Sequence, residues 1–226
     1  FSTSIKDTAS QLEQKLNEIG LNSKKIDVLA HCTGGLVARQ WIEQGNGKNL
    51  VNKLVMAGTP NNGTPWTRLK DWAIVAATFA ANNLTRYGVA PETIAFLSDK
   101  ARLSANLDRV SGDVRVGAAF LTQLNASPNP NVSYVVIAGN TSMIKNADDK
   151  TKSWVQRIFS KTNIATLSQK TLSLFLFGDE NDLATSVRSM NAVPVTRRTT
   201  TSFEVACDHF SYFNSLQSTT MIKHAL

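Results

Sequence analysis

The stretch Ala30-His31-Cys32-Thr33-Gly34-Gly35 lies between two segments of different periodicity. Residues 25–31 are apolar and β-branched, which is typical of a buried strand, whereas residues 34–45 have apolar side chains at helical spacing. A chain that passes from a strand into a helix through so short a connection doubles back sharply, and a side chain two residues before or after the turn would clash. Ala30 and Gly34 are small residues at those positions, so the pattern predicts that the turn exposes Cys32 above a sheet.

The rest of the chain alternates between helix-like and strand-like segments. A helix is expected over residues 5–19, ending at Gly20, because apolar residues recur there at steps of three and four: Ile5, Ala9, Leu12, Leu16 and Ile19. Further strands are expected over residues 51–57, 132–138 and 202–206, residues 172–177 form a short strand or a connector, and a last helix covers residues 212–225. This alternation predicts the α/β class, with a parallel sheet flanked by helices.

A strand-to-helix turn of this kind is where many enzymes present a nucleophile. The segment is a G-x-S-x-G elbow with Ala30 in place of the first glycine and Cys32 in place of serine. The thiolate is the nucleophilic form of cysteine, and a neighbouring imidazole lowers the pKa of a thiol. The chain has three histidines. His31 lies inside the turn and His224 in the expected last helix, so His209 is the candidate general base.

Four segments resemble the lipase-like α/β-hydrolases, in particular bacterial triacylglycerol lipases and related esterases. Residues 30–39, AHCTGGLVAR, resemble the H-S-M-G-G-L-V-A-R segment that holds the nucleophile. Residues 58–64 resemble the G-T-P-x-x-G-[ST] loop, residues 181–189 the N-D-G-V-V-P-x-x-S segment with the catalytic acid, and residues 208–210 the D-H-x segment with the catalytic histidine. The resemblance implies one α/β-hydrolase domain over residues 1–226, with helical lid segments or insertions at about 65–128 and 141–170.

The resemblance also implies a role for each matched residue. Asp182 would orient His209, in preference to the neighbouring Asp179 and Glu180. The N–H of Thr33 would bind the oxyanion, and no metal or other cofactor is expected. The elbow itself is expected to depend on Ala30, His31, Gly34 and Gly35.

The cysteine at position 32 leaves three interpretations open. It is a natural nucleophile, a replacement of serine that would trap an acyl-enzyme, or a sign of a degenerate site. The first predicts an esterase or lipase-type acyl hydrolase, or an acyltransferase, acting on small or lipid-like esters or thioesters. The alternatives are a catalytically silent module that binds a partner and a cysteine protease on the same scaffold.

Composition limits the other partners. The chain of 226 residues has a net charge of +7, but its basic residues are scattered, which argues against a nucleic-acid surface. Its longest apolar run, residues 72–81, is too short to span a bilayer, and no signal peptide is recognised. Cys32 and Cys207 are expected to be free thiols, which favours a reducing, cytoplasmic compartment.

The elbow lies unusually early in the chain. Only about 25 residues precede the elbow strand, whereas a hydrolase of the resembled type has several strands and a second oxyanion loop in front of it. We therefore expect the chain to be the C-terminal portion of the fold, with the sheet completed by an upstream polypeptide of the same protein or of another chain. An elbow strand left as an apolar edge would be prone to aggregation.

Overall fold

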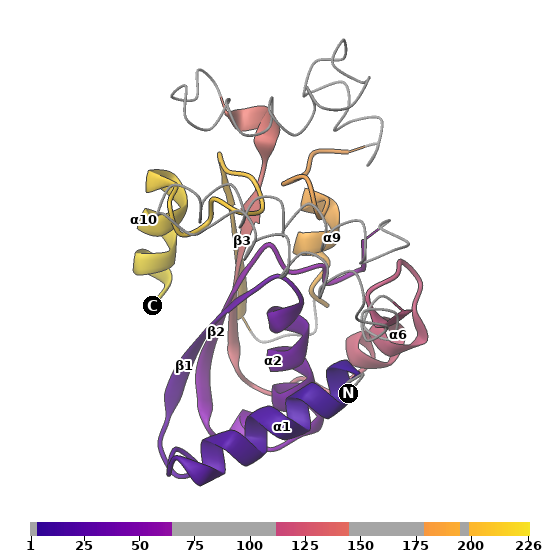
Figure 1. Ribbon diagram of the computed structural model, residues 1–226, viewed down its shortest axis with the longest axis vertical. Helices are drawn as coiled ribbons and strands as arrows, with labels where there is room; N and C mark the ends of the chain where they lie inside the picture. Colours follow the sequence, from indigo (N-terminus) through magenta and orange to yellow (C-terminus); the bar gives the residue numbers. More distant parts are fainter. Residues whose placement is uncertain (1–3, 65–111, 145–178, 195–198) are drawn as a thin grey trace, which may run out of the picture.

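The computed structural model describes residues 4–64, 112–144, 179–194 and 199–226. Within these ranges four parallel strands form one sheet in the order β1-β2-β3-β4 (Figure 1). Their bounds are Ile26–His31, Val51–Ala57, Ser133–Gly139 and Thr199–Val205. The predicted α/β class is confirmed, and all four strands end at the edge of the sheet where Cys32 follows β1.

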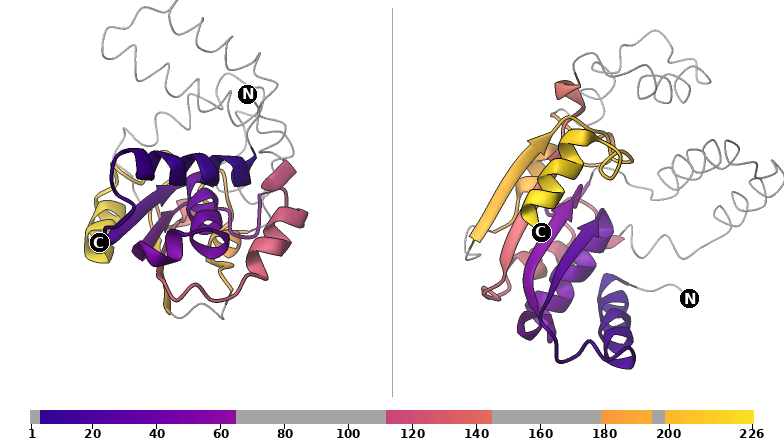
Figure 2. Two further views of the ribbon diagram at one scale, coloured as in Figure 1. Left: turned by 90° about the horizontal axis from the view of Figure 1, so that it is seen from below. Right: turned by 90° about the vertical axis from the view of Figure 1, so that its left-hand side faces the viewer.

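Helices cover both faces of this sheet (Figure 2). They are α1 (Ile5–Glu18), α2 (Thr33–Gln44), α6 (Ala119–Asn125), α9 (Val187–Asn191) and α10 (Leu216–Ala225), with short 3₁₀ turns at Gly47–Asn49 and Thr141–Met143. Side chains alternate along each strand, so neighbouring residues of β2 enter different cores. Leu54 and Met56 pack in a cluster with α1, α2 and α9, whereas Val55 and Ala57 pack in a cluster with α10.

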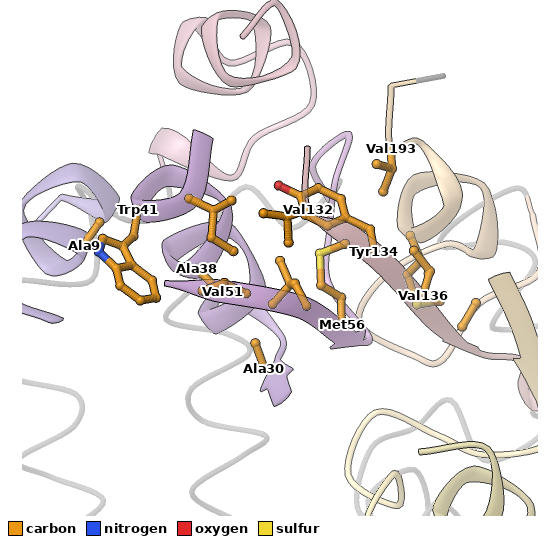
Figure 3. Close-up of a cluster of buried hydrophobic side chains, with 14 of the residues drawn as sticks. Ala9, Ala30, Ala38, Trp41, Val51, Met56, Val132, Tyr134, Val136 and Val193 are labelled. Atoms are coloured by element: carbon orange, nitrogen blue, oxygen red, sulfur yellow. The ribbon is translucent and has the colours of Figure 1, made fainter. Parts of the chain in front are cut away.

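The larger cluster fixes the elbow helix on the sheet (Figure 3). Trp41 and Ile42 of α2 are almost completely buried in it, together with Tyr134 of β3. Alternating strand residues and one stripe of α2 thus define the height and rotation of the helix that begins after Cys32.

A buried ion pair joins α2 to the segments around it. Arg39 donates from Nε to Glu43 Oε1 at 2.7 Å, and neither side chain has any exposed surface. Arg39 also donates to the side-chain oxygens of Asn61 and Asn125, each at 3.0 Å, and Tyr134 donates to Glu43 Oε1 at 2.9 Å. One buried network therefore links α2, the loop after β2, the end of α6 and β3.

The N-terminal helix follows the prediction closely. Ser4 and Asp7 form a capping box, and the main chain of Gly20 has a φ of 72°, which glycine tolerates better than other residues. Asp113 accepts a hydrogen bond from the N–H of Ile5 at 3.1 Å, so the start of α1 is also tied to a distant part of the chain.

Other boundaries differ from the prediction. The last strand begins at Thr199 rather than at residue 202, and the last helix begins at Leu216 because Ser215 caps it through the N–H of Ser218. The short helix α9 was not predicted. Residues 172–177 and most of 65–128 and 141–170 lie outside the described residues, so the single-domain organisation and the lid segments remain predictions. Among the described residues, no helix is both long and apolar enough to cross a membrane.

Candidate active site

The elbow residue Cys32 has the backbone conformation expected of a sharp turn. Its φ is 56° and its ψ is −135°, in a region that non-glycine residues seldom occupy. Its N–H donates to Ala57 O of β2 at 2.9 Å, which helps to hold the turn against the sheet. Helix α2 begins at Thr33. The N–H of a first helical residue makes no hydrogen bond within the helix and points out of its N-terminal end. The Cys32 thiol thus lies beside a helix N-terminus, where negative charge is stabilised.

The close packing expected at Gly34 is found at Gly35 instead. Apart from the adjoining residues and the backbone of its own helix, no atom of the described residues would lie within 4 Å of a Cβ at Gly34, so the predicted clash at that position is wrong. A Cβ at Gly35 would lie 2.0 Å from Thr59 Oγ1 and 2.8 Å from Thr59 Cβ. The reason is that Gly35 is buried against the loop after β2, whereas Gly34 is exposed. Ala30 is buried in the main core, as its small size allows.

The structure brings Asp182, rather than its neighbours, to His209. His209 Nδ1 lies 2.7 Å from Asp182 Oδ2, and both side chains are fully buried. The main-chain N–H of His209 also donates to the main-chain oxygen of Asp182 at 2.7 Å. Asp179 accepts a hydrogen bond from the N–H of Glu180, and Glu180 accepts from Asn140 and Ser142.

Four donors surround the Asp182 carboxylate. The N–H groups of Ala184 and Thr185 donate to Oδ1 at 2.9 and 2.7 Å, while His209 and the Tyr212 hydroxyl share Oδ2. The chain turns after Asp182 through Leu183, whose φ of 80° is left-handed, and this turn brings the two N–H groups to Oδ1. The resembled hydrolase segment has glycine there, which suits such a φ, so the leucine departs from the motif while the turn is retained.

Electrostatics link His209 to both of its expected partners. Burial by itself lowers the pKa of His209, but the interactions with Asp182 and then with Cys32 outweigh burial and raise this pKa to about 10. Asp182 is the partner that the geometry shows, at 2.7 Å from Nδ1. Such an arrangement can hold an imidazolium beside a thiolate and transfer a proton to a leaving group.

His31 packs directly against the general-base candidate. Its ring centroid lies 4.7 Å from that of His209, and its Nε2 lies 2.9 Å from the His209 main-chain oxygen. Because a carbonyl oxygen only accepts, Nε2 of His31 carries a proton in this bond. Burial, and then the charge of His209, lowers the pKa of His31 to about 4. His31 is therefore a neutral side chain that holds the His209 loop.

Sequence reasoning missed Tyr212, which was placed at the start of the last helix. Its hydroxyl donates to Asp182 Oδ2 at 2.9 Å and accepts from the N–H of Gly139 at 2.7 Å. A Cβ at Gly58 would lie 2.8 Å from the Tyr212 ring and 3.0 Å from Asp182 Oδ2. A Cβ at Gly139 would lie 2.6 Å from the Tyr212 hydroxyl and 2.9 Å from Asp182 Cβ. Two strand-end glycines thus leave room for this pair. The only available signal was that a buried tyrosine needs a partner for its hydroxyl.

The two cysteines are free, and β2 and β3 separate the strands that precede them. Cys207 is buried after β4, where burial, followed by the charges of Asp182 and Asp208, raises the pKa of its thiol. Cys207 therefore remains protonated, as expected of an inert buried thiol. His224 is exposed on α10. The described ranges contain no group of three or more His, Cys, Asp or Glu side chains suited to a metal ion.

Comparisons with known proteins agree with this geometry at the level of the fold. The model of the family described as "Domain of unknown function (DUF7379)" matches residues 1–226. No curated protein matches the sequence.

Solved structures provide the remaining comparisons. The mature form of the Bacillus licheniformis lipase BlEst2 is 17% identical, with a TM-score of 0.53, over 99% of this chain and 73% of that one. Its propeptide form is 19% identical, with a TM-score of 0.57, over 100% of this chain and 41% of that one. EstA from Clostridium botulinum is 14% identical, with a TM-score of 0.53, over 87% of this chain and 62% of that one. The fold is therefore that of the lipase-like α/β-hydrolases.

Proposed function

The chain belongs to the DUF7379 family, and for this member we propose acyl hydrolysis or acyl transfer on ester or thioester substrates through a covalent intermediate on Cys32. The observation that carries the proposal is the buried His209–Asp182 pair, with 2.7 Å between Nδ1 and Oδ2, which packs against His31, the residue before Cys32 in the strained turn. The α/β-hydrolase fold and the lipase BlEst2 among its structural neighbours support the same chemistry.

In the first half of the proposed reaction, the Cys32 thiolate attacks the substrate carbonyl carbon. The carbonyl π electrons move to oxygen, and the N–H of Thr33 donates to that oxyanion. The tetrahedral intermediate collapses, the bond to the leaving group breaks, and the imidazolium of His209 gives the leaving group its proton. Asp182, bonded to His209 Nδ1, fixes the ring so that Nε2 faces the reaction.

In the second half, His209 takes a proton from water or from an acceptor alcohol, amine or thiol as that nucleophile attacks the Cys32 thioester. The thiolate leaves, and the imidazolium–thiolate pair is restored. Water as the acceptor gives hydrolysis, and any other acceptor gives acyl transfer.

A substrate panel with four proteins tests this proposal. We expect the wild type to cleave p-nitrophenyl esters or acyl thioesters, and His209→Ala to lose about 100-fold or more of that rate. Cys32→Ala should be inactive, whereas Cys32→Ser should retain a hydroxyl nucleophile with a changed preference between ester and thioester. Mass spectrometry of the wild type after rapid quenching should find the acyl group on the peptide that contains Cys32.

Two other outcomes would select the alternative functions. Cleavage of peptides but not of esters would make the protein a cysteine protease. Absence of turnover, combined with iodoacetamide labelling of Cys32 that does not depend on His209, would favour a silent module that binds a partner.

We also propose that a further polypeptide segment pairs with β1. Within the described residues β1 pairs only with β2, and Leu29 on this edge strand is 38% exposed. An unpaired apolar edge is an aggregation hazard, and the chain covers 73% of the mature lipase BlEst2 and 41% of its propeptide form, so both contain further residues. A native protein with the mass of 24.6 kDa and full activity would contradict this proposal.

A further inference from the structure

Tyr212 lies against the oxygen of Asp182 that holds His209. The hydroxyl oxygen is 2.9 Å from Asp182 Oδ2, and the same Oδ2 lies 2.7 Å from His209 Nδ1. The ring is fully buried, so the contact is shielded from water.

The direction of the Tyr212 hydroxyl proton follows from its other contacts. The N–H of Gly139 donates to the hydroxyl oxygen at 2.7 Å, so the single hydroxyl proton must go elsewhere. Its two acceptors are Asp182 Oδ2 and the sulfur of Met190 at 3.4 Å. A carboxylate is a much stronger acceptor than a thioether, so the proton lies on the line to Asp182.

We infer that Tyr212 is a positioning residue that limits how strongly Asp182 holds the imidazolium of His209. The inference rests on the proposed function and deepens it. The positive end of the hydroxyl dipole lies next to Oδ2, where it satisfies part of the carboxylate's negative charge and disfavours a further positive charge on His209. His209 therefore releases its proton to a leaving group more readily than it would beside an unshared carboxylate.

Within the ranges that the structure describes, four titratable side chains act on His209. Asp182 is bonded to Nδ1, the rings of His31 and Tyr212 pack at 4.7 and 6.1 Å, and Cys32 acts on its charge. Burial, and then the charges of Asp182 and Cys207, raises the pKa of Tyr212 well above its usual value, so the hydroxyl keeps its proton while the other groups titrate.

Tyr212→Phe removes the hydroxyl and keeps the ring. We expect kcat to fall about tenfold while KM changes by less than about twofold, because the hydroxyl acts on proton transfer rather than on substrate binding. We also expect the pH at which His209 loses its proton, followed by NMR of the ring carbons, to move upward. Tyr134→Phe is the matched control, since it removes another buried tyrosine hydroxyl bonded to a carboxylate, that of Glu43.

Tyr212 would be merely structural if the two variants behaved alike, or if the titration of His209 in Tyr212→Phe moved downward. Should Tyr212→Phe fail to fold, 3-fluorotyrosine at position 212, whose hydroxyl is a stronger donor, takes its place. The pH at which His209 loses its proton should then move downward, and an unchanged or upward titration would overturn the inference. The NMR measurements need no substrate. A protein that turned over no ester or thioester would therefore contradict the proposed function, while the titration of His209 would still test Tyr212.

Discussion

His31 donates its Nε2–H to the main-chain oxygen of His209 at 2.9 Å, which joins the residue before Cys32 to the loop that holds the proposed general base. The two rings also pack at 4.7 Å. A charge on His31 would therefore repel the imidazolium of His209. For this reason the neutral state of His31 is part of the folded site.

The stability of the fold should depend on this neutral state at acid pH. The pKa of His31 is lowered from 6.5 to about 4, first by burial and then by His209, so the folded protein binds fewer protons there than the unfolded chain. The contribution of neutral His31 to the free energy of unfolding is present above about pH 6.5 and is lost as the pH falls toward 4. Denaturant titrations should show a smaller acid loss of unfolding free energy in His31→Gln than in the wild type. His224→Gln, at an exposed position, should follow the wild type.

His209 should have the opposite effect at alkaline pH. Its pKa is raised to about 10, because Asp182 and then Cys32 outweigh burial, so the folded protein holds this proton more tightly than the unfolded chain. The stabilisation is present below about pH 6.5 and is lost as the pH rises toward 10. The same titrations in Asp182→Asn should show a weaker alkaline loss, and equal losses would contradict the assignment.

Asp182 and Asp179 can be separated by their isosteric variants. Asp182→Asn removes the charge that orients His209, and we expect kcat to fall about 10³- to 10⁴-fold. Asp179→Asn should retain kcat within about twofold, because the Asp179 carboxylate bonds to the N–H of Glu180 instead. Ester or thioester turnover measures both, and a larger loss in Asp179→Asn would reverse the assignment.

The alternation of strand-like and helix-like segments predicted the α/β class, and the short turn at residues 30–35 predicted the residue types there, because both patterns are local in the sequence. The prediction that a side chain at position 34 would clash was wrong. The tight packing at the elbow is that of Gly35 against Thr59, which is distant in sequence. Tyr212 was missed for the same kind of reason: its partners, Asp182 and Gly139, come from other parts of the chain. Local periodicity cannot predict contacts between residues that are distant in the sequence.

A substitution at Gly35 tests that packing. Gly35→Ala should lower the free energy of unfolding by about 1–3 kcal/mol, because its Cβ would overlap the Thr59 side chain. Gly34→Ala is the matched control and should be neutral or stabilising by about 0.5 kcal/mol, since an exposed alanine favours a helix. Adding Thr59→Ala to Gly35→Ala should recover part of the loss. Chemical denaturation of the wild type and of these three variants gives the free energies of unfolding.

The buried ion pair Arg39–Glu43 should also contribute to the free energy of unfolding. Arg39→Met leaves the Glu43 carboxylate buried without its cation, and we expect a loss of about 3–5 kcal/mol in unfolding free energy. Arg39→Met combined with Glu43→Gln should cost less than Arg39→Met alone, because no unpaired charge remains. A double variant that is less stable than the single one would show that the glutamate has a separate role.

The parallel order of the strands has a consequence for the newly made chain. His31 and His209 are 178 residues apart, and β2 with β3 and β3 with β4 are pairs of strands far apart along the sequence. Pairings of this kind form slowly, because long loops must close before the contacts contribute. During synthesis Cys32 emerges well before Asp182 and His209, so the nascent polypeptide carries an unactivated thiol. If the proposed function holds, a reactive Cys32 thiol would therefore report that β4 has joined the sheet, which is a late step of folding.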